Sequence, residues 1–404
     1  MNIIFLSPNG QLNGPRRRIH NLSTFLANND HQVNVYCKSF YHSSNYRRTS
    51  NLLKIKKEII ENVNVYWVPS ISYSTNGLRR LISELQFVFL SLFHIILYKR
   101  SAEVLIADSV SPINGFFGLL ISKICRFKFI HQIRDVWPIA LVYDGALSKN
   151  SISYKVLKYL ELIQYKNCDW ICTTLPDVHS YIKSNRGDET KISYIRNGVN
   201  IKEFEYSEYI PGKIINVVYL GTISHAHDVI SVIKAFKLLK DIKLDHKFNL
   251  NIYGDGVKKK QSEEYCRHHD LTNVSFHGSV QRNKVPEILH KGDILVSPVL
   301  NSKAYIFGIN LNKNYDYFAA GRTVLLSSPL KINEVTIANA GYSCPAEDPK
   351  AILNALVHFE SLTDEDKKKF ANNARKYALK EFDSRLLAAK FESMLLNVSK
   401  IKKN

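Results

Sequence analysis

The order of apolar runs, glycine-containing loops and helical stretches, which starts twice along the chain, constrains the fold more than any other feature. Residues 2–7 form a short apolar run that ends in the loop PNGQLNG, and residues 15–29 then show helical spacing of apolar side chains. Residues 31–37 form the next apolar run. This strand, loop, helix, strand order predicts the beginning of a doubly wound α/β domain with a parallel sheet.

The alternation continues to about residue 200 and then begins again. The loop after the first run lacks GxGxxG, so a dinucleotide-binding fingerprint is not supported. A loop-like segment through Pro211 and Gly212 indicates a linker between two domains. Further strands are predicted at residues 63–68, 104–107, 127–133, 170–174 and 192–196 in the first domain, and at 214–220, 248–253, 274–277, 294–297, 323–327 and 341–344 in the second.

The charge of the chain favours an anionic surface or substrate. The sequence has 55 Lys and Arg against 36 Asp and Glu, a net charge of +19. Phospholipid, polyphosphate and nucleic acid are all candidates, and a general basic bias that aids solubility is the alternative. Nucleic acid is disfavoured because the basic residues are scattered rather than interleaved with aromatic residues in one module.

Cysteine usage and the amino terminus indicate the compartment. Six cysteines occur without a CxxC pair or a histidine in zinc spacing, so neither a metal site nor a disulfide framework is predicted. The chain opens directly on a strand pattern without a signal-peptide pattern. We therefore expect a cytoplasmic protein with reduced thiols.

One strongly apolar stretch, residues 81–98, is bracketed by basic residues. Polar residues interrupt it, and it lies inside an α/β pattern, which argues against a membrane span. A helix lying in the membrane interface and a helix packed in the domain remain equal alternatives. The bracketing residues are Arg79, Arg80, Lys99 and Arg100, and the interruptions are Glu84, Gln86, Ser91 and His94.

The stretch FGINLNKNYDYFAAG, residues 307–321, is predicted to be a loop that turns into a short helix. Helical spacing places Asn312, Lys313 and Asp316 on one side of its first turns. The amino-terminal end of a helix favours a phosphate, and Gly321 suits the left-handed position that ends a helix. The alternative is an ordinary capped surface helix.

Five segments together resemble glycosyltransferase family 4, particularly the bacterial transferases similar to the N-acetyl-L-fucosamine transferase of surface-polysaccharide synthesis. The order and spacing of these segments, from residue 1 to about 360, make the resemblance far more specific than any single motif. The segments are FGINLNKNYDYFAAG, GPRRRIHNLSTFLA, IRDVWP at 133–138, IRNGVN at 195–200 and YLGTISHAHD at 219–228.

The resemblance implies a GT-B fold, in which two Rossmann-like doubly wound domains face a cleft. Residues 1–200 would be the acceptor-binding domain and residues 201–383 the nucleotide-sugar-binding domain, with a terminal helix at about 384–404 returning to the first. It further implies a retaining transfer without metal or other cofactor. The sequence contains no DxD at a strand end that would suggest a metal site. The expected partners are a nucleotide sugar, with uracil favoured as its base, a polyprenyl-linked or saccharide acceptor and the anionic inner face of the plasma membrane, without nucleic acid.

The resemblance also assigns roles to donor residues. Asp316 would accept hydrogen bonds from ribose hydroxyls, and Lys313 would neutralise the diphosphate leaving group. Gly308 stands where the family has its first acidic residue, so backbone groups of residues 307–310 would serve instead. His225 replaces a lysine of the relatives, which makes phosphate contact there pH-dependent. The full donor set is Gly221, Thr222, His225, Gly254, His277, Gly278, Val280, Phe307, Gly308, Ile309, Asn310, Leu311, Asn312, Lys313 and Asp316.

On the acceptor side, the resemblance points to the segment IRDVWP. Arg134 would hold a sugar hydroxyl or a phosphate, and Asp135 would orient the acceptor or take its proton. An internal pair between these two residues is the alternative. Asp135, Arg134 and Lys313 are the predicted catalytic residues, and the predicted acceptor residues are Gly14, Arg16, Arg17, Arg134 and Trp137.

Three functions remain open from the sequence. The first is a retaining transferase that extends a lipid-linked saccharide in O-antigen, capsule or exopolysaccharide synthesis. The second is a sugar-nucleotide epimerase of double-Rossmann build, which Gly308 disfavours because an epimerase needs paired carboxylates. The third is a non-catalytic basic protein that binds membranes.

Overall fold

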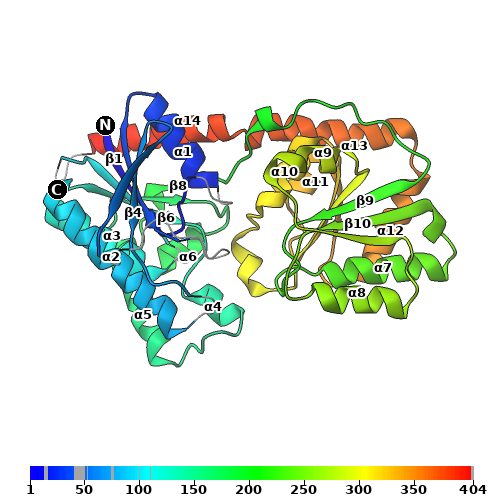
Figure 1. The fold of residues 1–404 in the computed structure, drawn as a ribbon, viewed down its shortest axis with the longest axis horizontal. Helices are drawn as coiled ribbons and strands as arrows, with labels where there is room; N and C mark the ends of the chain where they lie inside the picture. The colour runs from blue at the N-terminus through cyan, green and yellow to red at the C-terminus, as the bar shows by residue number, and fades with distance from the viewer. Residues whose placement is uncertain are drawn as a thin grey trace. The chain divides into compact units, whose positions relative to one another are not determined.

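The computed structural model describes residues 1–12, 17–40, 51, 53–73, 77–99, 101–109 and 111–401, without the side chain of Arg17. The chain divides into two compact units: unit 1 is Met1–Asn197 with Ser384–Asn404, and unit 2 is Gly198–Asp383. Each unit is an α/β domain built on one sheet with helices on its faces (Figure 1). The predicted architecture of two Rossmann-like domains is confirmed.

Unit 1 contains an eight-stranded sheet in the order β3-β4-β2-β1-β5-β6-β7-β8. Seven of these strands are parallel, and the central ones are almost completely buried because helices cover both faces. The strands are β1 (Asn2–Leu6), β2 (Gln32–Lys38), β3 (Lys56–Ile60), β4 (Val63–Val68), β5 (Val104–Asp108), β6 (Lys128–Ile133), β7 (Trp170–Thr173) and β8 (Ile192–Tyr194).

Strand β3 was not predicted, and it is antiparallel to β4. Its sequence, KKEII, begins with three charged residues and does not read as an apolar run. The two-residue connection, Glu61 and Asn62, has φ angles of 48° and 65°. Two successive positive φ angles are the geometry of the type I′ turn that closes tight hairpins. Neither residue is glycine, so the hairpin lacks its strongest sequence signal.

The helices of unit 1 cover its sheet on both sides. The last helix of the chain, α14, packs beside α1, and the ring of Phe391 stacks on that of Phe5 with centroids 6.0 Å apart. Helices α2, α3 and α5 cover the other face (Figure 1). The bounds are α1 (Arg17–Asn28), α2 (Leu78–Tyr98), α3 (Pro112–Cys125), α4 (Ile139–Tyr143), α5 (Ile152–Asn167), α6 (His179–Ser184), η1 (Glu189–Lys191) and α14 (Ser384–Lys400).

Unit 2 contains a six-stranded, fully parallel sheet in the order β11-β10-β9-β12-β13-β14. The order reverses at β9, where successive crossovers change direction, and such a switch point is where open α/β sheets bind ligands. The strands are β9 (Ile215–Leu220), β10 (Phe248–Tyr253), β11 (Val274–Gly278), β12 (Ile294–Pro298), β13 (Thr323–Ser327) and β14 (Gly341–Cys344).

Helices enclose the sheet of unit 2 with a separate apolar cluster on each face. One cluster includes α7 and α12, and the other includes α10, α13 and the π-helical turn η6. The bounds are η2 (Ile201–Glu203), α7 (Val229–Asp241), η3 (Asp245–Lys247), α8 (Lys259–His268), η4 (Arg282–Lys284), α9 (Val285–His290), η5 (Lys303–Phe307), α10 (Asn312–Ala320), α11 (Glu334–Ala338), α12 (Pro349–Ser361), α13 (Asp364–Tyr377) and η6 (Ala378–Phe382).

Candidate functional site

Helix α10 is anchored at the carboxyl end of the unit 2 sheet by the hydroxyl of Tyr317. This hydroxyl accepts a hydrogen bond from the backbone N–H of Leu220 at 2.9 Å and lies 3.3 Å from the carbonyl oxygens of Leu220 and Val296. Tyr317 is completely buried, and burial raises its pKa well above the ordinary value, so it stays neutral. The hydroxyl thus joins α10 to β9 and β12.

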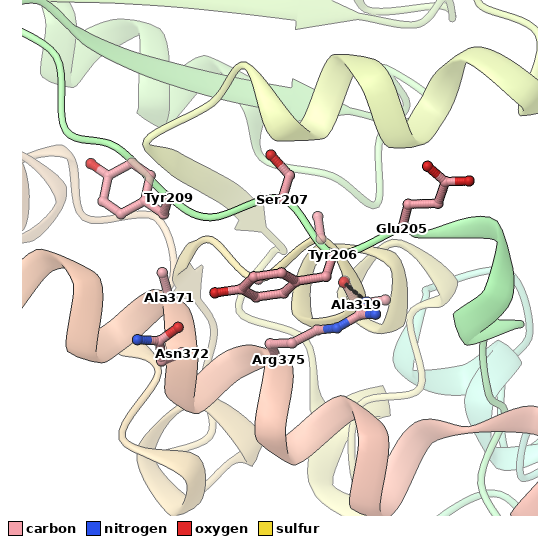
Figure 2. A pocket seen from close by; sticks show the side chains of 10 residues that line it. Glu205, Tyr206, Ser207, Tyr209, Ala319, Ala371, Asn372 and Arg375 are labelled. Atoms are coloured by element: carbon pink, nitrogen blue, oxygen red, sulfur yellow. Dashed lines mark hydrogen bonds between the residues drawn. The ribbon is translucent and has the colours of Figure 1, made fainter.

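The carboxyl-terminal end of α10 is closed by arginine side chains. Gly321 has the left-handed φ of 63°, as predicted for the residue that ends the helix. Arg375 donates to the carbonyl of Ala319 and, at 2.9 Å, to that of Phe204, and Arg322 donates to the carbonyl of Gly321 at 2.9 Å. Figure 2 shows Arg375 pointing from α13 into the small pocket at this end of the helix. The guanidinium groups satisfy the carbonyls and complement the negative end of the dipole.

At the opposite end of α10, Lys313 provides an ammonium group without a counter-ion. Its Nζ donates to the hydroxyl of Tyr219 at 3.2 Å and lies 4.3 Å from the centroid of that ring. No described carboxylate forms an ion pair with it. Burial lowers the pKa of Lys313 from 10.5 to about 7. A half-buried cation in the first turn of a helix is a site that favours an anion.

Two features keep space beside this ammonium. Leu311 stands at the N-cap of α10 and makes no side-chain cap hydrogen bond. Gly221, with φ of 154°, follows β9, and a Cβ atom added to it would lie 3.2 Å from Nζ of Lys313. A larger residue at 221 would therefore crowd the amine and adopt a strained backbone.

The glycines predicted for the donor site hold three loops together. The N–H of Gly221 donates to the carbonyl of Tyr253 at 2.9 Å, and the N–H of Gly254 donates to the carbonyl of Gly278 at 2.7 Å. A Cβ atom on Gly254 would lie 1.8 Å from the carbonyl oxygen of Gly221, so this position has room for glycine alone. These bonds extend the pairing of β9, β10 and β11 beyond the strands.

The charge of Lys313 acts on His227, a residue beside the predicted His225 that was not singled out from the sequence. His225 is exposed, whereas His227 is half-buried and its Nδ1 lies 3.1 Å from the hydroxyl oxygen of Ser224. Burial, and secondly the charge of Lys313, lowers the pKa of His227 to about 4. The sequence offered one signal for His227, its place directly before Asp228, the N-cap of α7. Thr222 is exposed, and its carbonyl accepts a hydrogen bond from Tyr219 at 2.7 Å.

Asp316 is buried and paired, so the alternative of an ordinary exposed helix carboxylate is not supported. Both of its oxygens accept hydrogen bonds from Arg282, one of them at 2.7 Å, and Arg282 also lies 3.4 Å from a carboxylate oxygen of Glu203. The side chains of Asp316 and Lys313 therefore have different partners, although both stand on α10.

Gly308, where the family motif has an acidic residue, has a backbone that disfavours any side chain. It follows the turn η5 with φ of 112° and ψ of 166°, a conformation that L-residues rarely adopt. Phe307 and Ile309 are buried beside it. Asn310 accepts a hydrogen bond from the hydroxyl of Tyr315 at 2.7 Å, while Leu311 is half-buried and Asn312 is exposed at the helix start. Apolar contacts and the bond to Asn310 thus contribute to holding the loop.

The predicted donor residues at the end of β11, His277, Gly278 and Val280, include one member of an ordered aromatic pair. The ring of His277 stacks on that of Tyr253 with centroids 4.4 Å apart, and its Nε2 lies 2.9 Å from the amide oxygen of Asn251. Val280 packs against the cluster that includes α10. His277 is exposed, so the stacked pair presents a flat aromatic surface at the end of β11.

In unit 1, the segment after β6 brings together Arg134, Asp135 and Trp137. Arg134 donates its backbone N–H to the hydroxyl of Ser109 at 3.2 Å, and the ring of Trp137 lies 5.4 Å from the guanidinium carbon of Arg80. Asp135 is exposed. Within the described part of the chain, no ion pair joins Arg134 to Asp135, so the alternative that they pair with each other is not supported.

A small polar pocket beside Asp135 was missed from the sequence. It is lined partly by His131 and Glu161, whose Nδ1 and Oε1 atoms are buried without a hydrogen-bond partner in the described structure. Burial lowers the pKa of His131 to about 4 and raises that of Glu161. Burial, followed by the charge of Asp135, also raises the pKa of Asp144. These residues are far apart in sequence, and none belongs to a recognised motif.

The arginine run after the first strand cannot be assigned to an acceptor site as a whole. Gly14 and Arg16 lie outside the described residues, and Arg17 begins α1 without a described side chain. Arg18 is buried, and it donates to the carbonyl of Arg196 at 2.8 Å and to the side chain of Gln132 at 3.3 Å. Arg18 is therefore a structural residue of the first sheet.

Comparison with known proteins covers both units. Residues 12–203 match the model described as Glycosyltransferase Family 4, and residues 201–377 match the model described as Glycosyl transferases group 1. A probable glycosyltransferase of Pseudomonas aeruginosa, WbjE, is 23% identical over 248 residues, which are 57% of this chain and 59% of WbjE. The match thus spans less than two thirds of that relative.

Solved structures resemble the whole chain. WaaG, a glycosyltransferase involved in lipopolysaccharide biosynthesis, has a TM-score of 0.69 and 17% identity, over 98% of this chain and 99% of WaaG. HepE of Anabaena, in complex with UDP-glucose, has a TM-score of 0.67 and 13% identity, over 98% of this chain and 100% of HepE. At these identities the likeness establishes the fold.

We predict that Lys313→Met raises the melting temperature of the free protein at about pH 6 by a few degrees. The folded pKa of about 7 lies below the ordinary 10.5, so folding disfavours the protonated amine. This penalty is complete below pH 7 and fades as the pH rises from 7 to 10.5. About 1 kcal/mol shifts the melting temperature by about 2–4 °C in domains of this size.

Calorimetry at about pH 6, 7.5 and 9 tests this prediction, because the gain should shrink as the pH rises. The matched control is Lys331→Met, which removes an exposed amine from the same unit. Loss of stability in Lys313→Met at every pH would contradict the prediction.

Proposed function

The chain belongs to glycosyltransferase family 4 and has the GT-B fold, and from this premise we propose that it transfers a sugar from a nucleotide sugar to a saccharide acceptor. The observation that carries this proposal is the ammonium of Lys313, which lies at the start of α10 and forms no ion pair with a carboxylate of the described residues. A nucleoside diphosphate supplies the negative charge that this position lacks. A protein that only binds membranes would have no need of such a site.

We propose a UDP-sugar as the donor. HepE, which shares the fold, binds UDP-glucose, and this supports uracil as the base. The diphosphate would lie against Lys313, with Gly221 leaving room for it and His227 close by. Asp316 would accept hydrogen bonds from the ribose, and Arg282 would hold its carboxylate in place.

In the transfer, the bond between the anomeric carbon and the donor phosphate breaks, and an acceptor hydroxyl forms the new glycosidic bond with retained configuration. Negative charge grows on the departing diphosphate, and Lys313 stabilises it more strongly in the transition state than in the ground state. The acceptor proton passes either to the departing phosphate or to Asp135, which is exposed and can also orient the acceptor. Arg134 would hold a hydroxyl or phosphate of the acceptor.

We further propose a polyprenyl-diphosphate-linked saccharide as the acceptor, in the synthesis of O-antigen, capsule or exopolysaccharide. The similarity to WaaG, which is involved in lipopolysaccharide biosynthesis, supports this class of product. The basic excess of the chain fits an acceptor that carries a diphosphate. The enzyme would then act from the cytoplasm as a peripheral protein at the inner face of the plasma membrane.

A donor screen tests the reaction directly. We expect slow hydrolysis of one UDP-sugar without acceptor, unchanged by EDTA, because Lys313 takes the place of a metal at the diphosphate. A set of UDP- and GDP-sugars measured by nucleotide release identifies the base and the sugar. Reversible conversion of the free donor without nucleotide release would instead indicate an epimerase, and loss of turnover in EDTA would contradict transfer without metal.

We predict that UDP affinity falls as the pH rises from about 7.5 to 9. Lys313, with a pKa of about 7 in the free protein, loses its proton over this range but must be protonated to bind the diphosphate. The limit is about tenfold in affinity per pH unit. The terminal phosphate titrates near pH 6, outside this window. Isothermal titration calorimetry measures the trend, and Lys313→Arg, which keeps its charge, should show none. An identical pH dependence in Lys313→Arg would contradict the assignment.

We predict that Asp316→Asn weakens UDP binding by about tenfold or more, because a hydrogen bond to a charged group contributes about 1.5–3 kcal/mol. The binding of 2′-deoxy-UDP should weaken less than that of UDP, since it lacks one ribose hydroxyl. Measuring Asp316→Asn in an Arg282→Met background separates two roles. If the effect of Asp316→Asn vanishes there, Asp316 serves only to position Arg282.

A further inference from the structure

The polar residues that interrupt the apolar sequence of α2 point toward the protein. The imidazole Nδ1 of His94 lies 2.8 Å from the hydroxyl of Tyr36 on the underlying sheet, and the side-chain oxygen of Gln86 accepts the backbone N–H of Ile71 at 3.0 Å. Ser91 is completely buried. The residues that interrupt the apolar sequence thus lie on the inner side, the reverse of an ordinary surface helix.

From Leu81 onward, every exposed residue of α2 is aliphatic or aromatic. The helix is long and apolar enough to cross a membrane by length and composition alone, yet Phe87, Val88 and Ile95 are buried in the core of unit 1. The residues that face outward are large: Phe93 is 60% exposed and Leu97 is 66% exposed. The other exposed apolar residues of α2 are Leu78, Leu81, Ile82, Phe89 and Tyr98.

Helices α3 and α5 continue this apolar side. Figure 1 shows α2, α3 and α5 on the same face of the sheet, α2 contacts α3 through the rings of Phe89 and Phe117, 5.0 Å apart, and α3 packs against α5. On α3, Leu120 and Ile124 are exposed four residues apart. On α5, the exposed residues Ile152, Val156 and Tyr159 form a second stripe with helical spacing. We call these exposed residues on α2, α3 and α5 the three-helix face.

The charges on these three helices have one sign. Their only two carboxylates are Glu84, which accepts a hydrogen bond from Arg80 at 2.9 Å, and Glu161, which is buried and bonded to Lys158 at 2.6 Å. Every exposed charge on the helices or at their ends is therefore basic. The exposed basic residues are Arg79, Lys123, Arg126, Lys155 and Lys166.

We propose that the three-helix face docks unit 1 on an anionic phospholipid bilayer. Apolar side chains would enter the boundary between headgroups and acyl chains, and the basic residues would contact the anionic headgroups. A bilayer accepts an irregular apolar surface without matching its shape. A symmetric dimer through the same face would place its basic residues against their own copies, which is unfavourable. This inference deepens the proposed function, since it names the surface that reaches a lipid-linked acceptor.

Vesicle co-sedimentation of the full chain tests the proposal. We expect binding to vesicles of phosphatidylcholine with phosphatidylglycerol, weaker binding to phosphatidylcholine alone, and a decrease with salt because exposed charges are screened. The pair Phe93→Glu and Leu97→Glu on α2 should lower the bound fraction at least tenfold, and so should the pair Ile152→Glu and Val156→Glu on α5.

The control pair is Ile332→Glu and Ile337→Glu, which makes the same change at exposed apolar residues of unit 2 and should leave vesicle binding unchanged. Thermal melting checks that each variant folds. An α5 pair that behaves like the control would overturn the three-helix face. Light scattering that shows a dimer lost in the α2 pair would assign the face to a second copy.

The affinity for UDP, measured in the same variants, separates this inference from the proposed function. Intact UDP affinity with unchanged vesicle binding in both pairs would overturn the docking surface and leave sugar transfer standing. Vesicle binding that follows the expected pattern in a chain that binds no nucleotide would contradict the proposed transfer instead.

Discussion

Anchoring of α10 by the buried hydroxyl of Tyr317 is the interaction on which the candidate donor site depends. One phenol oxygen joins the middle of the helix to β9 and β12, where the sheet changes direction. The arginines at the carboxyl-terminal end fix the helix at its second point. With those contacts satisfied, the end that is left without a side-chain cap is the amino-terminal one, which holds Lys313. The helix thus presents its positive end as a fixed structure.

The free protein holds this positive charge at an energetic disadvantage. Burial depresses the pKa of both Lys313 and His227, and their proximity adds to the effect on the histidine. An anion that enters reverses the sign of the local potential and raises both pKa values. Part of the binding free energy of an anion would therefore come from relieving this unfavourable burial of positive charge. A preorganised site stabilises the charge that develops on a leaving group in the same way.

Much of the fold could be predicted from the sequence, because buried parallel strands read as apolar runs between glycine-containing loops. The hairpin of β3 was not predicted because its turn, Glu61 and Asn62, reaches positive φ without glycine. In the site, the segment 307–321 was identified, but a sequence does not reveal partners that are distant along the chain. Arg282 stands 34 positions from Asp316, and only folding brings them together. His227 was missed for the same reason, since the charge of Lys313 that acts on it stands 86 positions along the chain.

The absence of an acidic residue at position 308 has a local physical reason that composition cannot supply. With φ of 112°, Gly308 allows the chain to pass from η5 into the start of α10. A carboxylate there would require a different backbone, and a different backbone would move the first turn that carries Lys313. The missing acidic residue at position 308 and the position of the Lys313 ammonium therefore depend on the same backbone conformation.

The orientation of α2 on the sheet, rather than its composition, likewise decides which of its side chains are exposed. The sequence of this helix has the same apolar content whether its polar residues face the sheet or solvent. His94 and Gln86 are bonded inward, so the apolar side remains outside, and α3 and α5 extend it with exposed residues that their own sequences do not single out. Since exposed apolar surface of this extent is costly in water, its position next to basic residues alone favours an anionic lipid surface over solvent.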